Sequence, residues 1–296
     1  MLEHGGRLRE AAAHYQIPLE NWLDLSTGIN PEAWPVPALS MNCWHRLPET
    51  NDGLEAAAAQ YYGNPNLLPV AGSQAAIQLL PTLLPRALSA ATPYVLLCNP
   101  NNPTADRHPH AIAVDAAKQL KKRGGWLIVD EAFIDATPED SLTPLAGTTE
   151  APNLIVFRSL GKFFGLAGAR VGFLFAAPDL LTKLAEIKGP WAVAGPSREA
   201  AKLALQDRDW QATQRPRLLA ASQRLHNLLA PLGEVKSTAL FTALTTPHSV
   251  ELHEYLARQG ILTRRFEQQP LLRFGLPANE TGWQRLTNAL GTWKPA

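Results

Sequence analysis

Three apolar segments that each end in a polar turn constrain the fold of this 296-residue chain more than any other feature. YVLLC (94–98), WLIVD (126–130) and NLIVF (153–157) have the length and the side chains of buried strands. A segment typical of a helix, residues 111–123, lies between the first two. Strands that are apolar on both faces and alternate with helices favour a parallel sheet covered on each side. The pattern therefore predicts an α/β fold.

Polar residues at the ends of these strands predict where a ligand binds. NPNNPT (99–104) follows the first strand, Asp130 ends the second, and SLGK (159–162) follows the third. Ligands of such sheets bind at the carboxyl ends of the strands. We therefore expect these groups to converge on one crevice.

The character of the chain changes after residues 189–190. Helical residues 197–230 precede two strand-like runs, 239–246 and 271–277, which is the order of a smaller α+β domain. We expect three parts: an N-terminal arm at 1–40, a large domain at 41–190 and a small C-terminal domain at 191–296.

Charge and cysteine content exclude several classes of function. The net charge is +1, and the basic residues cluster only at Lys121–Arg123 and Arg264–Arg265, so we expect no nucleic-acid partner. The two cysteines, Cys43 and Cys98, form no CxxC pair, which disfavours a disulfide framework and a thiolate metal site. There is no secretory signal and no apolar run long enough to cross a bilayer, so we expect a cytoplasmic protein without membrane contact.

The stretch FRSLGKFFGLAGARVGF (157–173) holds a single lysine, Lys162, among apolar residues and glycines. Burial disfavours the charged ammonium, and a neutral amine can form a Schiff base with an aldehyde. Ser159 and Arg170 could supply a hydroxyl and a guanidinium to a phosphate. The alternative is a surface loop with an incidental lysine, and this stretch alone leaves both interpretations open.

Three further positions each have a functional and an ordinary interpretation. Asp130 could pair with a protonated pyridine nitrogen or cap a helix. Gly72 and Ser73, at a helix start, could bind an anion or form an ordinary N-cap. Asn102 could hydrogen-bond a ring hydroxyl or form a turn. Together with Lys162, these groups suit one ligand that carries a phosphate, a pyridine nitrogen, a phenolic oxygen and an aldehyde: pyridoxal 5′-phosphate.

The wording of these motifs resembles a known family. GSQAAI, NPNNPT, VDEAF and SLGKFFGLAGARVGF resemble the fold-type-I pyridoxal-phosphate aminotransferases, class I/II. The resemblance implies a mainly parallel sheet flanked by helices, with a smaller α+β C-terminal domain. Within the family, HGGRLREAA, DLSTGINP and WHRLPE resemble the threonine-phosphate decarboxylases of cobalamin biosynthesis. That likeness implies a homodimer that converts L-threonine O-3-phosphate to (R)-1-amino-2-propanol O-2-phosphate. The alternative is an aminotransferase of the histidinol-phosphate type.

The resemblance also assigns roles to single residues. Lys162 would bear the Schiff base, Asp130 would pair with the pyridine nitrogen, and Asn102 would face the phenolic oxygen. The cofactor phosphate would be held by Gly72, Ser73, Ser159 and Arg170, and the small phosphorylated amino-acid substrate by Arg273, Arg264, His4 and Asn30.

The chain departs from the family pattern in three places. Phe133 stands where many aminotransferases have a tyrosine, which favours decarboxylation, and Leu47 replaces a tyrosine that reaches a neighbouring subunit's cofactor. Only 28 residues separate Ser73 from Asn102. The family usually has roughly forty more, enough for further crossover units and for the aromatic residue that stacks on the cofactor ring. We therefore expect a large domain shortened between residues 80 and 94, and a catalytically impaired member as a third possibility.

Overall fold

The computed structural model describes residues 5–74, 77 and 93–295. The chain divides into two compact units. The large unit comprises Ala33–Asn102 and Asp106–Arg215, and the small unit comprises Met1–Glu32, Pro103–Ala105 and Pro216–Ala296. This division rests on compactness alone. The predicted N-terminal arm (1–40), large domain (41–190) and small C-terminal domain (191–296) stay a prediction.

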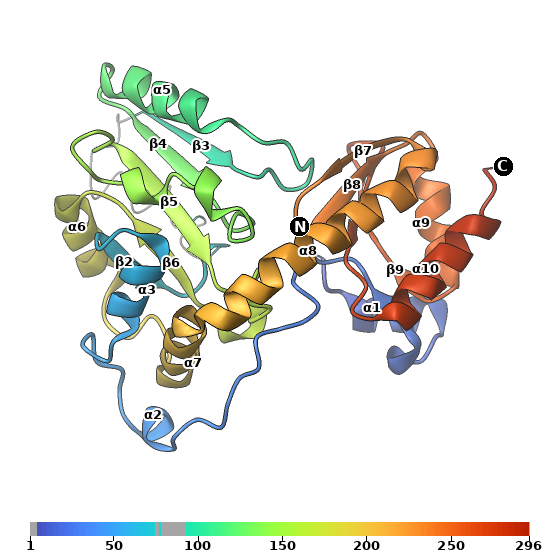
Figure 1. Cartoon of the computed structure of the whole chain (residues 1–296), viewed down its shortest axis with the longest axis horizontal. Helices are drawn as coiled ribbons and strands as arrows, with labels where there is room; N and C mark the ends of the chain where they lie inside the picture. Colours follow the sequence, from blue (N-terminus) through green and yellow to red (C-terminus); the bar gives the residue numbers. More distant parts are fainter. Residues whose placement is uncertain (1–4, 75–76, 78–92, 296) are drawn as a thin grey trace. The chain divides into compact units, whose positions relative to one another are not determined.

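A five-stranded sheet in the order β2-β6-β5-β4-β3 forms the centre of the large unit (Figure 1). Strands β3, β4 and β5 pair in parallel, and β6 runs antiparallel to both β5 and β2. Four of the strands therefore run in one direction, as the predicted mainly parallel sheet requires. Their bounds are β2 (Leu67–Val70), β3 (Tyr94–Cys98), β4 (Trp126–Asp130), β5 (Leu154–Ser159) and β6 (Gly172–Phe175).

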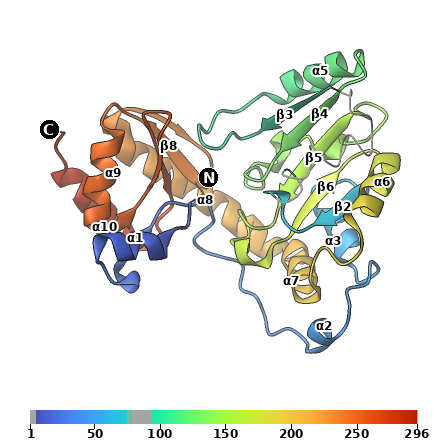
Figure 2. The same ribbon diagram turned by 180° about the vertical axis from the view of Figure 1, so that it is seen from behind.

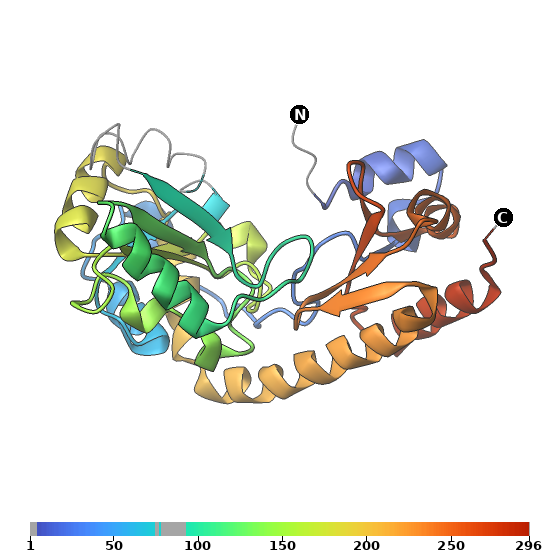
Figure 3. The ribbon, with the colours of Figure 1, turned by 90° about the horizontal axis from the view of Figure 1, so that it is seen from above.

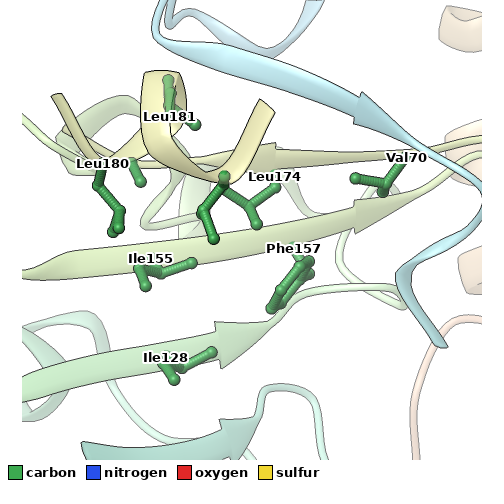
Figure 4. Packing of buried hydrophobic residues seen from close by; sticks show 9 residues of the cluster. Val70, Ile128, Ile155, Phe157, Leu174, Leu180 and Leu181 are labelled. Atoms are coloured by element: carbon green, nitrogen blue, oxygen red, sulfur yellow. The ribbon is translucent and has the colours of Figure 1, made fainter. Parts of the chain in front are cut away.

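Helix α6 (Pro178–Lys188) covers one face of this sheet, because its leucines repeat on one side and meet alternate residues of the strands. Ile155 and Phe157, two residues apart in β5, point to this face (Figure 4). Phe173 and Phe175 of β6 point to the other face. The cluster under α6 contains Val70, Ile128, Ile155, Phe157, Leu174, Ala176, Leu180, Leu181 and Leu184.

The other face of the sheet is covered by α3 (Leu54–Tyr62), whose Tyr62 ring lies 5.5 Å from that of Phe173. The sequence predicts this helix over 52–62: Asp52 accepts a hydrogen bond from the Leu54 amide, and Gly63 ends the helix with φ +72°. Helix α5 (His110–Lys121) lies along β4 (Figure 2). This unit also contains α2 (Asn42–His45) and α7 (Gly195–Gln206).

The small unit contains a four-stranded antiparallel sheet in the order β10-β11-β8-β7, as expected for an α+β fold (Figure 3). Long helix α8 (Arg208–Leu229) enters this unit at Pro216, and its Ser222 hydroxyl donates to the Thr238 carbonyl at 2.7 Å. A parallel pair, β1 with β9, joins the N-terminal residues to this unit. The bounds are α1 (Leu8–Tyr15), β1 (Leu23–Asp24), β7 (Glu234–Ser237), β8 (Phe241–Thr245), α9 (Ser249–Arg258), β9 (Ile261–Leu262), β10 (Arg264–Phe266), β11 (Leu271–Gly275) and α10 (Glu280–Thr292).

Candidate active site

The register of the large sheet brings the predicted phosphate-binding residues together. Gly172 of β6 pairs with Val70 of β2 on one side and with Ser159 of β5 on the other. The turn that follows Val70 therefore lies beside Ser159. A Cβ atom added at Gly172 would lie 2.7 Å from the Ser73 backbone nitrogen, and one added at Gly72 would lie 2.5 Å from Nη2 of Arg170. We call Gly72, Ser73, Ser159 and Arg170 the anion cluster.

The donors of the anion cluster fit a phosphate. Ser73 and Ser159 are buried hydroxyl residues, and Arg170 is an exposed cation at φ +53° whose Nη1 donates to the Ala167 carbonyl at 3.2 Å. The Ser159 hydroxyl accepts from the Gly161 amide at 3.3 Å, which orients it within the loop before Lys162. Hydroxyl, backbone amide and guanidinium donors are the groups that bind phosphate oxygens in proteins.

Replacing Gly172 by alanine is expected to weaken binding of pyridoxal 5′-phosphate about 10-fold and to lower the melting temperature. The new Cβ would lie 2.7 Å from the Ser73 nitrogen and 2.8 Å from the Arg158 carbonyl oxygen, and both are backbone atoms that cannot rotate away. Fluorescence titration would measure the affinity. The matched control is Gly168→Ala in the same motif, where a Cβ would meet nothing within 4 Å. Equal affinities in the two variants would contradict this packing argument.

Asp130 and Lys162 lie at the neighbouring strand ends. Asp130 ends β4, opposite Cys98 of β3, and its Oδ1 accepts from the Ala132 amide at 3.1 Å. Burial of the carboxyl raises the pKa of Asp130 to about 6, against which the Ala132 amide and the Lys162 ammonium act. The Lys162 Nζ lies 5.2 Å from the centre of the Phe133 ring. The structure thus places an amine and a carboxyl group, both predicted to be catalytic, within electrostatic reach of each other.

Asn102 lies in the turn that follows β3, where its backbone amide donates to the Cys98 thiol. Burial raises the pKa of Cys98 to about 12; the Asp130 carboxylate also raises it, and the Asn102 amide and Lys162 lower it. Asp130, Asn102 and Lys162 therefore all lie close enough to the Cys98 thiol to act on its pKa. The predicted contact of the exposed Asn102 side chain with a phenolic oxygen stays a prediction.

The predicted substrate residues lie in the small unit. Arg264 and Arg273 are direct cross-strand partners in β10 and β11. Arg273 is buried, its Nη2 donates to the Ser26 carbonyl at 2.8 Å, and its guanidinium lies 5.2 Å from the Phe241 ring centre. Burial and, to a smaller extent, the Arg264 charge together lower the pKa of Arg273 to about 9. Two adjacent cations are suited to an anionic group.

Two weaker substrate assignments have different outcomes. Asn30 is buried, and its Oδ1 accepts from the Glu32 amide at 3.0 Å. His4 lies outside the described residues. The adjacent Gly5 approaches Arg273, since a Cβ added there would lie 3.5 Å from Nη2. The roles of Asn30 and His4 stay predictions.

Sequence reasoning missed a buried ion cluster beneath Asp130, formed by Glu131, Asp135 and Arg158. The available signal was Arg158 itself, a charge inside a strand that is otherwise apolar. Among the described residues, no group of three His, Cys, Asp or Glu side chains is placed to hold a metal. In the same part of the chain, no helix is long and apolar enough to span a membrane.

Comparison with known proteins settles the family. The sequence profile of the family described as aminotransferase class I and II matches residues 84–293. The chain belongs to this family. A protein of Pseudomonas aeruginosa named threonine-phosphate decarboxylase is 51% identical, over 100% of this chain and 99% of its own length. One of the same name from Sinorhizobium is 40% identical, over 97% of each.

A solved structure agrees on the fold. Histidinol-phosphate aminotransferase from Sinorhizobium meliloti, in complex with pyridoxal-5′-phosphate, has a TM-score of 0.80 at 18% identity, over 98% of this chain and 94% of its own. Together with the family match, this confirms the predicted fold-type-I architecture.

The Pseudomonas alignment also measures the predicted shortening. It extends over 332 positions and includes all of this 296-residue chain, so at least 36 positions of the alignment face a gap in this chain. The size agrees with the expected loss of crossover units. The predicted location between residues 80 and 94 falls mostly outside the described residues; Tyr94, at the start of β3, is 41% exposed.

Proposed function

We propose that this protein is a pyridoxal-phosphate-dependent decarboxylase that converts L-threonine O-3-phosphate to (R)-1-amino-2-propanol O-2-phosphate in cobalamin biosynthesis. The observation that carries the proposal is the 51% identity, over the whole chain, with a protein named threonine-phosphate decarboxylase. The arrangement of the anion cluster, Asp130 and Lys162 supports it, because these groups match the phosphate, nitrogen and aldehyde of the cofactor.

Pyridoxal 5′-phosphate, when bound, supplies an aldehyde for the substrate amine and a ring that accepts the electron pair released at Cα. The side chains of the protein would position the cofactor and transfer protons. Asp130 would hold the proton on the ring nitrogen, and the anion cluster would fix the phosphate. Lys162, released when substrate binds, would donate a proton to Cα after carbon dioxide leaves.

Orientation decides which bond at Cα breaks, because only the bond perpendicular to the ring is activated. Arg273 and Arg264 would hold the substrate's anionic groups so that the carboxylate takes that position. Phe133, at the place of a tyrosine, offers no hydroxyl to the cofactor, and its ring lies below the Lys162 amine. With hydrogen in the perpendicular position, the same residues would support amino transfer, which is the second candidate.

One experiment distinguishes these outcomes. The purified protein is incubated with pyridoxal 5′-phosphate and L-threonine O-3-phosphate, and carbon dioxide and the phosphorylated amino alcohol are measured. Release of both in equal amounts supports the decarboxylase. Amino transfer to 2-oxoglutarate without carbon dioxide would replace it with the aminotransferase. Absence of both reactions would indicate that the missing positions have impaired catalysis.

Arg273→Gln is expected to raise the KM for L-threonine O-3-phosphate about 10- to 100-fold, because it removes a charged hydrogen-bond donor for an anion. The kcat is expected to change less, since Arg273 binds the substrate rather than moving a proton. Steady-state kinetics would measure both constants. Arg224→Gln is the control in the same unit, because Arg224 forms an exposed ion pair with Glu280. An unchanged KM in Arg273→Gln would exclude the assigned role.

We also propose that the protein is a cytoplasmic homodimer. The large unit exposes several large apolar side chains, and their burial would stabilise subunit association. Trp44 and Leu47 are 63% and 64% exposed. Val36, Met41 and Trp191 are also exposed.

A further inference from the structure

A buried cluster of charges lies directly behind the strand ends of the candidate site. Arg158 of β5 is 2% exposed, and Glu131 and Asp135 are fully buried. The Arg158 Nη2 lies 2.7 Å from Oδ1 of Asp135, and its Nη1 lies 3.4 Å from Oε2 of Glu131. One guanidinium therefore joins two carboxylates that belong to the turn after β4.

Hydrogen bonds from neighbouring segments fix both carboxylates. Glu131 accepts from the Leu142 amide at 2.7 Å and from the hydroxyls of Ser141 and Thr143. Asp135 accepts from the Tyr61 hydroxyl at 3.0 Å. A carboxylate held by this many donors stays in one position. The turn between Glu131 and Asp135, which carries Phe133, is consequently tied to β5.

Burying these three ions costs free energy, so the stability of the fold alone does not explain why the chain has them. Two carboxylates and a guanidinium lose their hydration, and apolar residues of the same volume are often as stabilising. The position of the cluster offers an explanation. Glu131 directly follows Asp130, and Arg158 directly precedes Ser159, so the ion pair joins the residues next to a predicted catalytic acid and a predicted phosphate ligand.

The cluster also affects the ionisation of the Asp130 carboxyl group. Asp130 lies opposite Cys98 on the neighbouring strand β3. The charges of Lys162, Glu131 and Arg158 also act on its carboxyl group. Burial is the main cause of its raised pKa; Glu131 raises that pKa further, whereas Arg158 lowers it. Without Arg158, the negative charge of Glu131 would act on the Asp130 carboxyl without the positive charge that opposes it.

We propose that Arg158 is a positioning residue for the reaction: by pairing with Glu131 and Asp135 it fixes the turn after β4 and keeps Asp130 an ionised partner for the cofactor's pyridine nitrogen. This inference rests on the proposed function, because it concerns the same cofactor. Arg158 acts through the two carboxylates and through Asp130 rather than on the substrate.

The test compares four proteins: wild type, Glu131→Gln, Arg158→Met, and the double variant Glu131→Gln/Arg158→Met. In the cofactor-free proteins, NMR of the aspartate side-chain carboxyl carbons measures the titration midpoint of Asp130, whose signal is assigned with Asp130→Asn. In parallel, the Kd for pyridoxal 5′-phosphate is measured across the same pH range. Arg208→Met is the matched control, because Arg208 is exposed and its guanidinium lies 5.7 Å from the centre of the Tyr61 ring.

Arg158→Met is expected to raise the Asp130 midpoint by about one pH unit, and Glu131→Gln to lower it. The double variant is expected to return close to wild type, because it removes a positive and a negative charge together. The pH below which cofactor binding weakens should move in the same order, and Arg208→Met should leave both measurements unchanged. If Arg158→Met does not fold, a comparison of Glu131→Gln with the double variant still shows whether Arg158 shifts the Asp130 midpoint.

Equal Asp130 midpoints in the folded variants would overturn the inference, and so would shifted midpoints that leave the pH dependence of cofactor binding unchanged. A wild-type protein that binds no cofactor would instead overturn the proposed function. The midpoints in cofactor-free protein would then still decide whether Arg158 controls the ionisation of Asp130. The two failures are therefore distinguishable.

Discussion

Replacing Lys162 by alanine is expected to lower the rate of carbon dioxide release from L-threonine O-3-phosphate by at least ~10⁴-fold. The amine lies over the Phe133 ring and within electrostatic reach of the Asp130 carboxyl, in a stretch whose Ser159 and Arg170 are predicted to hold the cofactor phosphate. The Lys162 charge acts on the Asp130 carboxyl and lowers its pKa. Both the covalent attachment of the cofactor and the return of a proton to Cα would therefore be lost.

The attachment can be measured separately from the rate. Borohydride reduction fixes the bond between an amine and the cofactor aldehyde, and mass spectrometry of the peptides then identifies the modified lysine. The label is expected on the peptide that contains Lys162 and is expected to vanish in Lys162→Ala. Lys183→Ala, an exposed position on α6, is the control. A label that persists in Lys162→Ala on another lysine would contradict the assignment.

The sequence alone predicts the three paired parallel strands of the large sheet well. β3, β4 and β5 are runs of large apolar residues that end abruptly in polar turns, and period and composition suffice to recognise such runs. Because parallel strands end at one edge, the convergence of Asn102, Asp130 and Ser159 follows from the order of the elements. The helix at 52–62 likewise carries its own start and stop residues, Asp52 and Gly63.

The other two strands of that sheet, β2 and β6, could not be predicted in the same way. β2 has four residues and contains Pro69, which removes an amide donor, and β6 begins inside the glycine-rich motif that was interpreted only as a ligand loop. β6 pairs antiparallel with β5, the strand before it, and with β2, which lies far away in the sequence. The existence of β2 depends on this long-range pairing, and so does the register that places Gly72 beside Ser159.

Sequence patterns also cannot predict which charged residues lie next to each other in the folded protein. The direct opposition of Arg264 and Arg273 requires the register of β10 and β11. The pairing of Arg158 with Glu131 requires the turn after β4 to fold back along β5. The residues themselves are visible in the sequence, but which charges meet is a property of the folded chain.

Asp130→Asn is expected to reduce catalysis while stabilising the cofactor-free protein. The carboxylate would stabilise the positive charge on the pyridine nitrogen, and loss of such an electrostatic partner costs about 10²- to 10³-fold in rate. The stability effect has the opposite sign. Burial raises the pKa of Asp130 from 3.8 to about 6 in the folded protein. The unfolded chain therefore loses this proton first, and the free energy of unfolding falls as the pH rises through that window.

Above this window the ionised carboxylate destabilises the cofactor-free fold by up to about 3 kcal/mol. The Asp130→Asn substitution would remove this cost, and the amide oxygen of the new side chain could still accept from the Ala132 amide. Denaturant unfolding of both cofactor-free proteins is expected to show the variant more stable at pH 8 and equal to wild type near pH 3. Wild type should regain the difference when cofactor binds, because the pyridine nitrogen then pairs with the charge. A variant that is less stable than wild type at pH 8 without cofactor would show that Asp130 has another structural partner, and that its burial is not a cost accepted for catalysis.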